Sequence, residues 1–300
     1  MISLDAFLQL PCEEIARLVR ESGTKVVVFP INGTRRWFML EHGHKKWDDP
    51  VEAYLDIVGK QTIELAKLIF EHGIDTLLIP VIGREMLETR ENYMEQLGAR
   101  GLARVADHPD FLSFYKEYGI RVRFYGDYRK KMSSAPYAHL VASFDDVSER
   151  TKRNSRCRLF YGVFADHATE TIADLAIRYH NEHGVVPDKP ALVERYYGEP
   201  VKPVDIFIGF DKFAVYDYPL LGWGEEDIYF TVAPSLYMTD LQLRAILYDH
   251  LYTRKEAQAE YSMLSTQERE NLRQFYRKHQ QFTFGTGRME NRVWVPNFES

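Results

Sequence analysis

The sequence predicts an α/β fold in which helices flank a doubly wound, mostly parallel central sheet, in a single domain spanning residues 1–300. Short apolar runs typical of buried strands recur along the chain, and helical segments of a dozen or more residues separate them. Parallel neighbours need crossovers of this length, whereas antiparallel neighbours can be joined by short turns. No internal repeat or low-complexity tract interrupts this order.

Six apolar runs are expected to form the strands of this sheet. The first is the clearest, because a run of β-branched and aromatic residues ends at Pro30 and is followed by a short polar turn. The expected strands are residues 25–29, 76–81, 121–125, 158–164, 204–208 and 228–232.

The expected helices lie between these strands. In residues 51–72 the apolar side chains recur at helical spacing, and His72-Gly73 ends the segment because glycine readily closes a helix. Residues 129–137 are expected to form a loop and residues 149–156 a charged linker. Helices are expected at residues 4–21, 51–72, 84–106, 108–118, 169–181 and 241–257, with another after the turn that follows Pro30.

Composition limits the classes of partner and compartment. A hydrophobic fraction of 45% can bury a substantial core, and a net charge of −6 argues against nucleic acid as a partner. Cys12 and Cys157 fit neither a disulfide framework nor a zinc pattern, so we expect reduced packing residues. No signal-peptide pattern or membrane span of ~18 apolar residues is present, so we expect a cytoplasmic protein.

The turn after the first strand predicts a diphosphate site. Ligands bind at the carboxyl ends of strands in open α/β sheets. The backbone amides of a glycine-containing turn and of a helix N-terminus favour an anion there. Arg35 and Arg36 add fork-shaped cationic donors that suit phosphate oxygens.

The same residues carry a family resemblance. The segment from Asn32 to Trp37 resembles the Asp-Gly-Asn-Arg-Arg-Trp signature of the cis-prenyltransferases, the undecaprenyl diphosphate synthase family. Phe29-Pro30 and Phe38 narrow the resemblance to the tuberculosinol/isotuberculosinol synthase (tuberculosinyl adenosine transferase) branch. Similar blocks follow in order at residues 70–74, 113–117, 124–128, 207–210, 229–235 and 246–250.

The resemblance implies a substrate, an activity and partners. It implies that a bicyclic C20 prenyl diphosphate of the tuberculosinyl (halimadienyl) type is ionised with Mg²⁺ and diphosphate is released. The allylic cation would pass to water, giving a diterpene alcohol, or to a nucleoside such as adenosine. It further implies a homodimer, whose interface we expect after residue 200.

The resemblance also assigns roles to individual residues. Gly33, Thr34, Arg35 and Arg36 would bind the diphosphate, while Trp37 and Phe29 would line a hydrophobic pocket. Tyr54 and Tyr93 match tyrosines implicated in catalysis. A phenol can contact the allylic cation through its ring and can position water or relay a proton. The alternative is that both are ordinary tyrosines on helices.

Asn32 departs from the family, which has a metal-binding aspartate at this position. An amide can hydrogen-bond a phosphate oxygen, but it is a poorer magnesium ligand because it brings no charge. Three interpretations stay open: a natural variant that uses other ligands, a pseudoenzyme, and an Asp→Asn change made to trap substrate. The last is favoured, because the other matched positions are intact. Nearby Asp48-Asp49 is either a metal-binding pair or, as we favour, a solvated turn or helix start.

Residues that hold a second diphosphate in chain-elongating relatives are missing. An ungapped match places the two elongation arginines at Gly209 and Val215 and the accompanying serine at Asp217. Loss of both cationic donors should abolish the isopentenyl diphosphate pocket. We therefore expect ionisation of one prenyl diphosphate without elongation. The alternatives are a chain-elongating cis-prenyltransferase and a catalytically silent accessory subunit.

Overall fold

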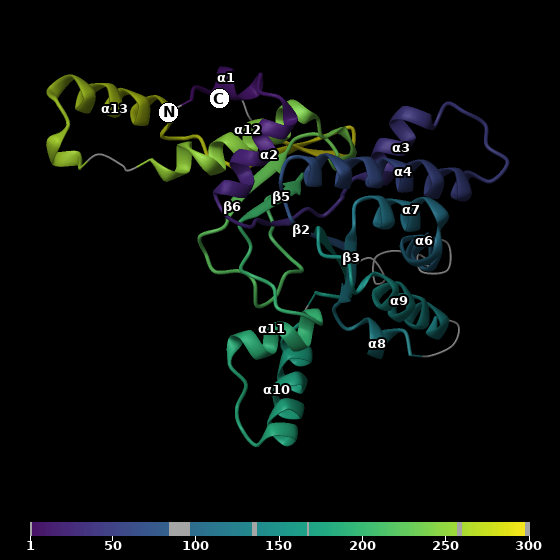
Figure 1. The fold of residues 1–300 in the computed structure, drawn as a ribbon. Coiled ribbons are helices and arrows are strands. Elements are labelled where there is room, and N and C mark those ends of the chain that lie inside the picture. The colour runs from purple at the N-terminus through teal and green to yellow at the C-terminus, as the bar shows by residue number, and fades with distance from the viewer. Residues whose placement is uncertain (1, 84–96, 134–136, 167, 257–259, 298–300) are drawn as a thin grey trace.

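A computed structural model describes residues 2–83, 97–133, 137–166, 168–256 and 260–297 (Figure 1). Its centre is a six-stranded sheet with the strand order β3-β4-β2-β1-β5-β6, and every pairing of neighbours is parallel. The expected fold class is thus confirmed. The strands are β1 (Val26–Val28), β2 (Thr76–Ile82), β3 (Ile120–Tyr125), β4 (Cys157–Val163), β5 (Ile206–Phe210) and β6 (Asp227–Thr231).

Helices follow most of the strands. They are α1 (Leu4–Leu8), α2 (Cys12–Glu21), α3 (Thr34–His42), α4 (Pro50–Glu71), α6 (Ala99–Asp107), α7 (Pro109–Glu117), α8 (Tyr128–Lys131), α9 (Ala138–Thr151), α10 (Thr169–His183), α11 (Lys189–Tyr197), α12 (Asp240–Leu251) and α13 (Thr266–His279). None of the described helices is long and apolar enough to cross a membrane.

Several expected boundaries were wrong. The helix expected at residues 4–21 is two helices, because Pro11 lies between them and caps the second. The loop expected at residues 129–137 begins within α8, and the linker expected at 149–156 begins as the last turn of α9. Sequence patterns predicted neither α11 and α13 nor the hairpin of β7 (Gly287–Glu290) and β8 (Val293–Pro296).

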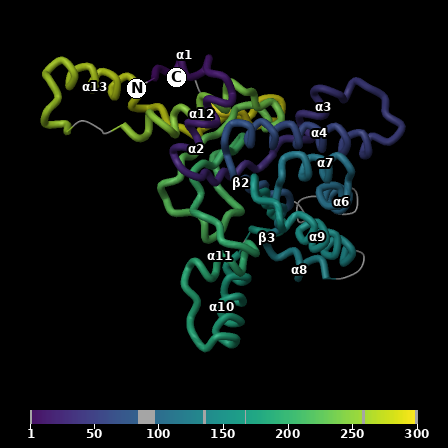
Figure 2. The backbone as a smooth tube through the Cα atoms, in the orientation of Figure 1, coloured from purple at the N-terminus to yellow at the C-terminus, as the bar shows by residue number. Residues whose placement is uncertain are grey.

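Side chains of the sheet alternate between two apolar layers. Val27 and Phe29 face one layer, whereas Val26 and Val28 face the other. Helices α2, α4, α6, α7, α9 and α12 cover the first layer, and α11 with residues 216–221 covers much of the second. The backbone trace shows α10 and α11 side by side, with α10 extending away from the sheet (Figure 2). The sheet is therefore buried on both faces.

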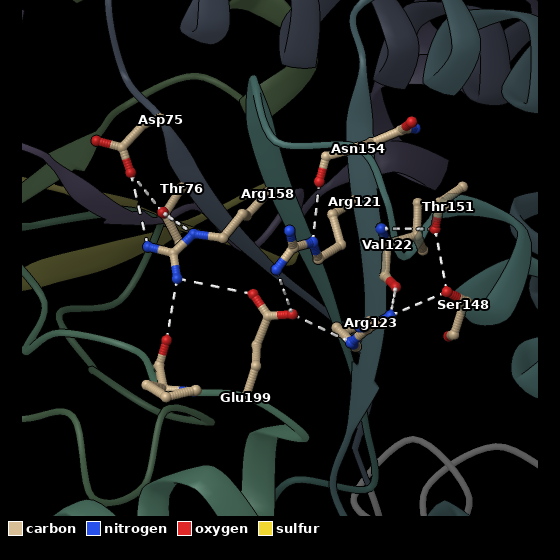
Figure 3. A network of polar contacts seen from close by, with 11 residues as sticks. Asp75, Thr76, Arg121, Val122, Arg123, Ser148, Thr151, Asn154, Arg158 and Glu199 are labelled. Carbon is tan, nitrogen blue, oxygen red and sulfur yellow. Dashed lines mark hydrogen bonds and ion pairs between the residues drawn. The ribbon is translucent and has the colours of Figure 1, made fainter.

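A buried carboxylate ties α11 to the amino ends of the sheet strands (Figure 3). Glu199, only 8% exposed, lies 3.4 Å from Arg121 and 3.2 Å from Arg123. It also lies 3.7 Å from Arg158, whose Nε donates to Thr76 Oγ1 at 3.0 Å. Removing Glu199 would leave three guanidinium groups without this shared acceptor.

We predict that Glu199→Ala lowers the free energy of unfolding by about 1–3 kcal/mol, because half-buried charges lose their partner. Glu182→Ala is the matched control, since Glu182 accepts from Arg195 at 2.5 Å but is about half exposed; its loss should stay below about 0.5 kcal/mol. Urea unfolding measures both. Equal losses would show that the Glu199 network is not structurally important.

We also predict a loss of stability in mild acid that depends on His250. Its Nδ1 lies 2.7 Å from Asp227 Oδ2, while its buried Nε2 has no hydrogen-bond partner among the described residues. Burial lowers the pKa of His250 below 6.5, outweighing the opposite effect of Asp227. The unfolded chain then binds the proton more readily, so stability should fall as pH falls below about 6.5. His250→Gln should reduce the dependence of the free energy of unfolding on pH, measured by urea unfolding at several pH values. An unchanged dependence would contradict the assignment of this effect to His250.

Candidate active site

Gly33 brings the first turn of α3 against the end of β5 and the segment that follows β6. It is the N-cap of α3 with φ +74°, and a Cβ here would lie 2.7 Å from the Phe210 ring and 2.9 Å from Pro234 Cβ. Only glycine fits this close approach without strain. Because Gly33 has no side chain, no side chain caps α3, and its first amides are left to meet an anion.

The two arginines of the signature lie on this first turn. Arg36 donates to Asp211 Oδ2 at 3.2 Å, and its guanidinium carbon lies 5.2 Å from the centre of the Phe210 ring. Arg35 is exposed beside it. The structure therefore places two guanidinium side chains and the positive end of α3 together, as an anion site requires.

Asn32 is held through its backbone and its side chain. Its N–H donates to Ser235 Oγ at 3.0 Å, and its carbonyl accepts from the Ser235 N–H at 3.1 Å. The side-chain Nδ2 donates to the Tyr216 hydroxyl. An aspartate in the same place could instead accept from that hydroxyl, so this contact is compatible with either residue.

The turn fits magnesium only with help from the substrate. Magnesium is usually held by one or two carboxylates together with substrate phosphates and water. Asn32 offers one uncharged carbonyl oxygen, and the described residues include no group of three His, Cys, Asp or Glu that could hold a metal. A magnesium ion would therefore be held chiefly by diphosphate oxygens and water, with Asn32 as its ligand from the turn.

The Asp48-Asp49 pair begins a helix. Asp49 is the N-cap of α4 and accepts from the Val51 and Glu52 amides at 3.0 and 2.9 Å. The hydrogen bond from the Glu52 amide is the main cause of the lowered pKa of Asp49. Of the favoured interpretations, a solvated turn or a helix start, the structure shows the helix start for Asp49.

Tyr54 joins the turn at residues 32–36 to a largely apolar cavity. Its hydroxyl lies 2.8 Å from Thr34 Oγ1, and its ring packs edge-on against Phe38 with the centres 5.4 Å apart. Both Thr34 and Tyr54 line a cavity of about 150 Å³ between α4, β2 and α6. Other side chains lining it are Ile31, Leu55, Val58, Ile79, Ile82, Leu102, Val105, Phe111 and Tyr161.

The remaining sequence-predicted residues lie elsewhere. Tyr93 falls outside the described residues. Trp37 is buried, with its ring centre 5.3 Å from His42 and 6.4 Å from Tyr237. Phe29 is fully buried in the sheet core. Neither Trp37 nor Phe29 is among the described residues that line the apolar cavity.

The structure explains why one elongation arginine has no counterpart. A Cβ at Gly209 in β5 would lie 2.4 Å from the Phe230 ring, so no side chain fits there. Val215 and Asp217 instead line a separate hollow together with Asp166. Gly209 and Val215 therefore provide no cationic side chain for a second diphosphate.

Sequence reasoning missed the residues that support the turn. Tyr216, Asp211 and Ser235 contact residues 32–36 from 175 to 203 positions away in the chain. The similar block at 229–235 was the one available signal, because it contains Ser235. Nothing in local sequence patterns pairs Asp211 with Arg36 or Tyr216 with Asn32.

We predict that Gly33→Ala lowers the free energy of unfolding by at least about 2 kcal/mol, because it adds a steric clash to left-handed backbone strain. Gly224→Ala is the matched control: Gly224 has φ +85° but nothing within 4 Å of an added Cβ. The control isolates backbone strain, about 1–2 kcal/mol. Urea unfolding compares the two, and equal losses would contradict the close approach at Gly33.

Two curated proteins are similar to the chain over nearly its whole length, although no protein-family model matches it. Tuberculosinyl adenosine transferase of Mycobacterium tuberculosis (strain CDC 1551 / Oshkosh) is 42% identical over 296 residues, which cover 98% of each chain. (+)-Kolavelool synthase of Herpetosiphon aurantiacus is 26% identical over 305 aligned residues, covering 99% of this chain and 96% of the synthase.

Solved structures agree on the fold. A probable undecaprenyl diphosphate synthase from Campylobacter jejuni is similar in structure with a TM-score of 0.55 and 16% sequence identity. The match covers 79% of this chain and 97% of the synthase. Lavandulyl diphosphate synthase from Lavandula x intermedia is similar in structure with a TM-score of 0.59 and 16% sequence identity. The match covers 77% of this chain and 97% of that synthase. By sequence, the chain belongs to the family of tuberculosinyl adenosine transferase, and it shares the fold of undecaprenyl and lavandulyl diphosphate synthases.

Proposed function

We propose that the chain ionises a bicyclic C20 prenyl diphosphate of the tuberculosinyl (halimadienyl) type and passes the allylic cation to adenosine or water. One observation carries the proposal: the Thr34–Tyr54 contact joins a cationic turn to an apolar cavity. A prenyl diphosphate has the same two parts, a charged head and an apolar body. The 42% identity to tuberculosinyl adenosine transferase supports this substrate class.

Diphosphate departure is the step that the turn would assist. The bond between the allylic carbon and the diphosphate oxygen breaks, and its electron pair leaves with the diphosphate. Arg35, Arg36 and the first amides of α3 stabilise the charge that grows on that oxygen. Asp211 and the Phe210 ring position Arg36 for this contact. Magnesium, when bound, would supply further positive charge to the departing diphosphate.

The apolar cavity would protect the cation until capture. Most of the side chains that line it are apolar, and the rings of Tyr54 and Phe111 offer negative π faces. The Tyr54 hydroxyl lies at the border with the diphosphate turn, where it can position an acceptor or hold a proton. Capture by a ring nitrogen forms a C–N bond, whereas capture by water forms a C–O bond and releases a proton.

We predict that Arg36→Ala lowers kcat/KM for diphosphate release from tuberculosinyl diphosphate about 10²–10³-fold, because the growing charge loses a donor. Arg178→Ala, which removes an exposed partner of Asp174 on α10, should change it less than about twofold. Released diphosphate is measured with Mg²⁺ present. Similar rates for the two variants would rule out this turn as the diphosphate site.

The role of Asn32 is tested by comparing the chain with Asn32→Asp in the same assay. A carboxylate should increase the rate and lower the Mg²⁺ concentration needed for half-maximal turnover, because it binds magnesium more strongly than an amide. Equal magnesium requirements would show that residue 32 is not a metal ligand. Mass spectrometry of the products, with and without adenosine, identifies the acceptor.

The chain should not elongate its substrate. Gly209 leaves no room for an elongation arginine, so labelled isopentenyl diphosphate should not be incorporated.

We also propose a homodimer formed through the region after residue 200. In support, β6 is an edge strand of the sheet, and its Ile228 and the following Val232 are exposed apolar residues.

A further inference from the structure

A second phenol lines the apolar cavity and belongs to a buried chain of hydrogen bonds. Tyr161 on β4 pairs with Ile79 of β2, and both residues line the cavity. The Tyr161 hydroxyl lies 2.8 Å from that of Tyr115 on α7, which donates to the Val105 carbonyl at 2.7 Å. Both tyrosines are only 1% exposed. Val105 lines the cavity too, so the pair of hydroxyls lies at the cavity wall.

The end of helix α6 sets the direction of these hydrogen bonds. The Val105 carbonyl lies in the last turn of α6, and its usual donor would be the amide of residue 109, which is Pro109 and has no N–H. The Tyr115 hydroxyl satisfies this carbonyl instead, and it has only one proton. The proton between the two phenols therefore belongs to Tyr161. Burial raises the pKa of both phenols, so both keep their protons at neutral pH.

Tyr161 consequently offers an oxygen, and no hydroxyl hydrogen, to the cavity. Its lone pairs form the negative end of a chain of aligned dipoles, in which each hydrogen bond polarises the next. Val105 already has its donor in Tyr115, so a phenylalanine at position 161 would leave that bond intact. The Tyr161 hydroxyl thus adds a negative oxygen to a wall formed mostly of apolar side chains.

The size of the cavity limits what can lie beside this oxygen. Its volume of about 150 Å³ matches that of an engineered cavity that holds one benzene molecule. A C20 body is much larger, so only part of it fits. Thr34 and Tyr54 line the cavity where it meets the turn at residues 32–36, so the part that enters is the allylic unit next to the diphosphate. The Tyr161 oxygen and the reacting carbons would then share one small space.

We propose that Tyr161 is a further catalytic residue whose oxygen stabilises the allylic cation; the proposal rests on the proposed function. When diphosphate leaves, the C–O bond breaks with its electron pair, and the positive charge stays on the allylic carbons. The Tyr161 oxygen attracts that charge without forming a bond and without gaining or losing a proton. Tyr115 is a positioning residue, because it holds the Tyr161 hydroxyl hydrogen away from the cation.

The kinetics of diphosphate release from tuberculosinyl diphosphate test this role. Tyr161→Phe keeps the ring but removes the oxygen, so kcat should fall about tenfold while KM changes less than about twofold, because the charge develops only as the bond breaks. Tyr115→Phe keeps the Tyr161 oxygen but frees its hydrogen to turn toward the cation, so kcat should fall as well. Circular dichroism checks that both variants are folded.

Tyr118→Phe is the matched control. It removes a phenol hydroxyl that donates to the exposed Glu71, and Tyr118 is not among the described residues that line the cavity; kcat should stay within about twofold of the unmodified chain. An unchanged kcat in Tyr161→Phe would overturn the proposal, and so would a rise in KM without a fall in kcat. An unchanged kcat in Tyr115→Phe would overturn the positioning role of Tyr115.

Equilibrium binding isolates the effect of charge without turnover. The probe is a prenyl dimethylsulfonium ion, which is positive at its reacting end, and its neutral counterpart has carbon in place of sulfur. Each is titrated by calorimetry with inorganic diphosphate and Mg²⁺ present. Tyr161→Phe should weaken binding of the sulfonium about tenfold and change binding of the neutral compound less than about twofold. Equal weakening of both compounds would show a packing role and overturn the proposal, as would unchanged binding of the sulfonium.

Separate outcomes distinguish this proposal from the proposed function. Absence of diphosphate release from the unmodified chain would contradict the proposed function, and the sulfonium titration would still decide the role of Tyr161. Equal rates of release from Tyr161→Phe and the unmodified chain would overturn the role of Tyr161 and leave the proposed function intact.

Discussion

The contact between the turn at residues 30–33 and the segment at 234–235 fixes the site, and most of the functional geometry depends on it. Ser235 bonds the backbone of Asn32 in both directions and donates to the Pro30 carbonyl at 3.2 Å. Gly33 allows Phe210 and Pro234 to approach closer than any side chain would permit. These contacts direct the N-terminus of α3 toward the carboxyl edge of the sheet, where its amides and arginines can meet a diphosphate.

This turn lies between two hollows. On the side of α4, Tyr54 leads to a largely apolar cavity; on the side of β4 and β5, Tyr216 lines a separate hollow of about 560 Å³. The proposed diphosphate site and the cavity proposed to protect the cation are therefore adjacent, and Thr34 belongs to both. The buried Tyr125 and Tyr197, which donate to backbone carbonyls at residues 217 and 219, together with Glu199 at the opposite ends of the strands, hold these regions in place.

Sequence patterns predicted the elements whose signal is local. The apolar runs located the strands to within a few residues, and the Gly-Thr-Arg-Arg segment located the start of a helix at the carboxyl edge of the sheet. They could not reveal the partners of that turn, because Asp211 and Tyr216 reach it from about 175 to 184 residues away. Helix α13 was missed because its polar sequence buries no side chain, and helix α1 was merged with α2 because the break at Pro11 was overlooked. Trp37 and Phe29 were assigned to a hydrophobic pocket by resemblance, whereas both side chains are buried in the core of the fold.

A complex with a non-hydrolysable thiodiphosphate analogue of the tuberculosinyl substrate, solved crystallographically with Mg²⁺, tests the central claim most directly. We expect diphosphate oxygens within hydrogen-bond distance of Arg35, Arg36 and the first amides of α3. We also expect the end of the prenyl body next to the diphosphate to enter the cavity lined by Tyr54. Diphosphate bound away from this turn, or a prenyl group that does not enter that cavity, would contradict the proposed function.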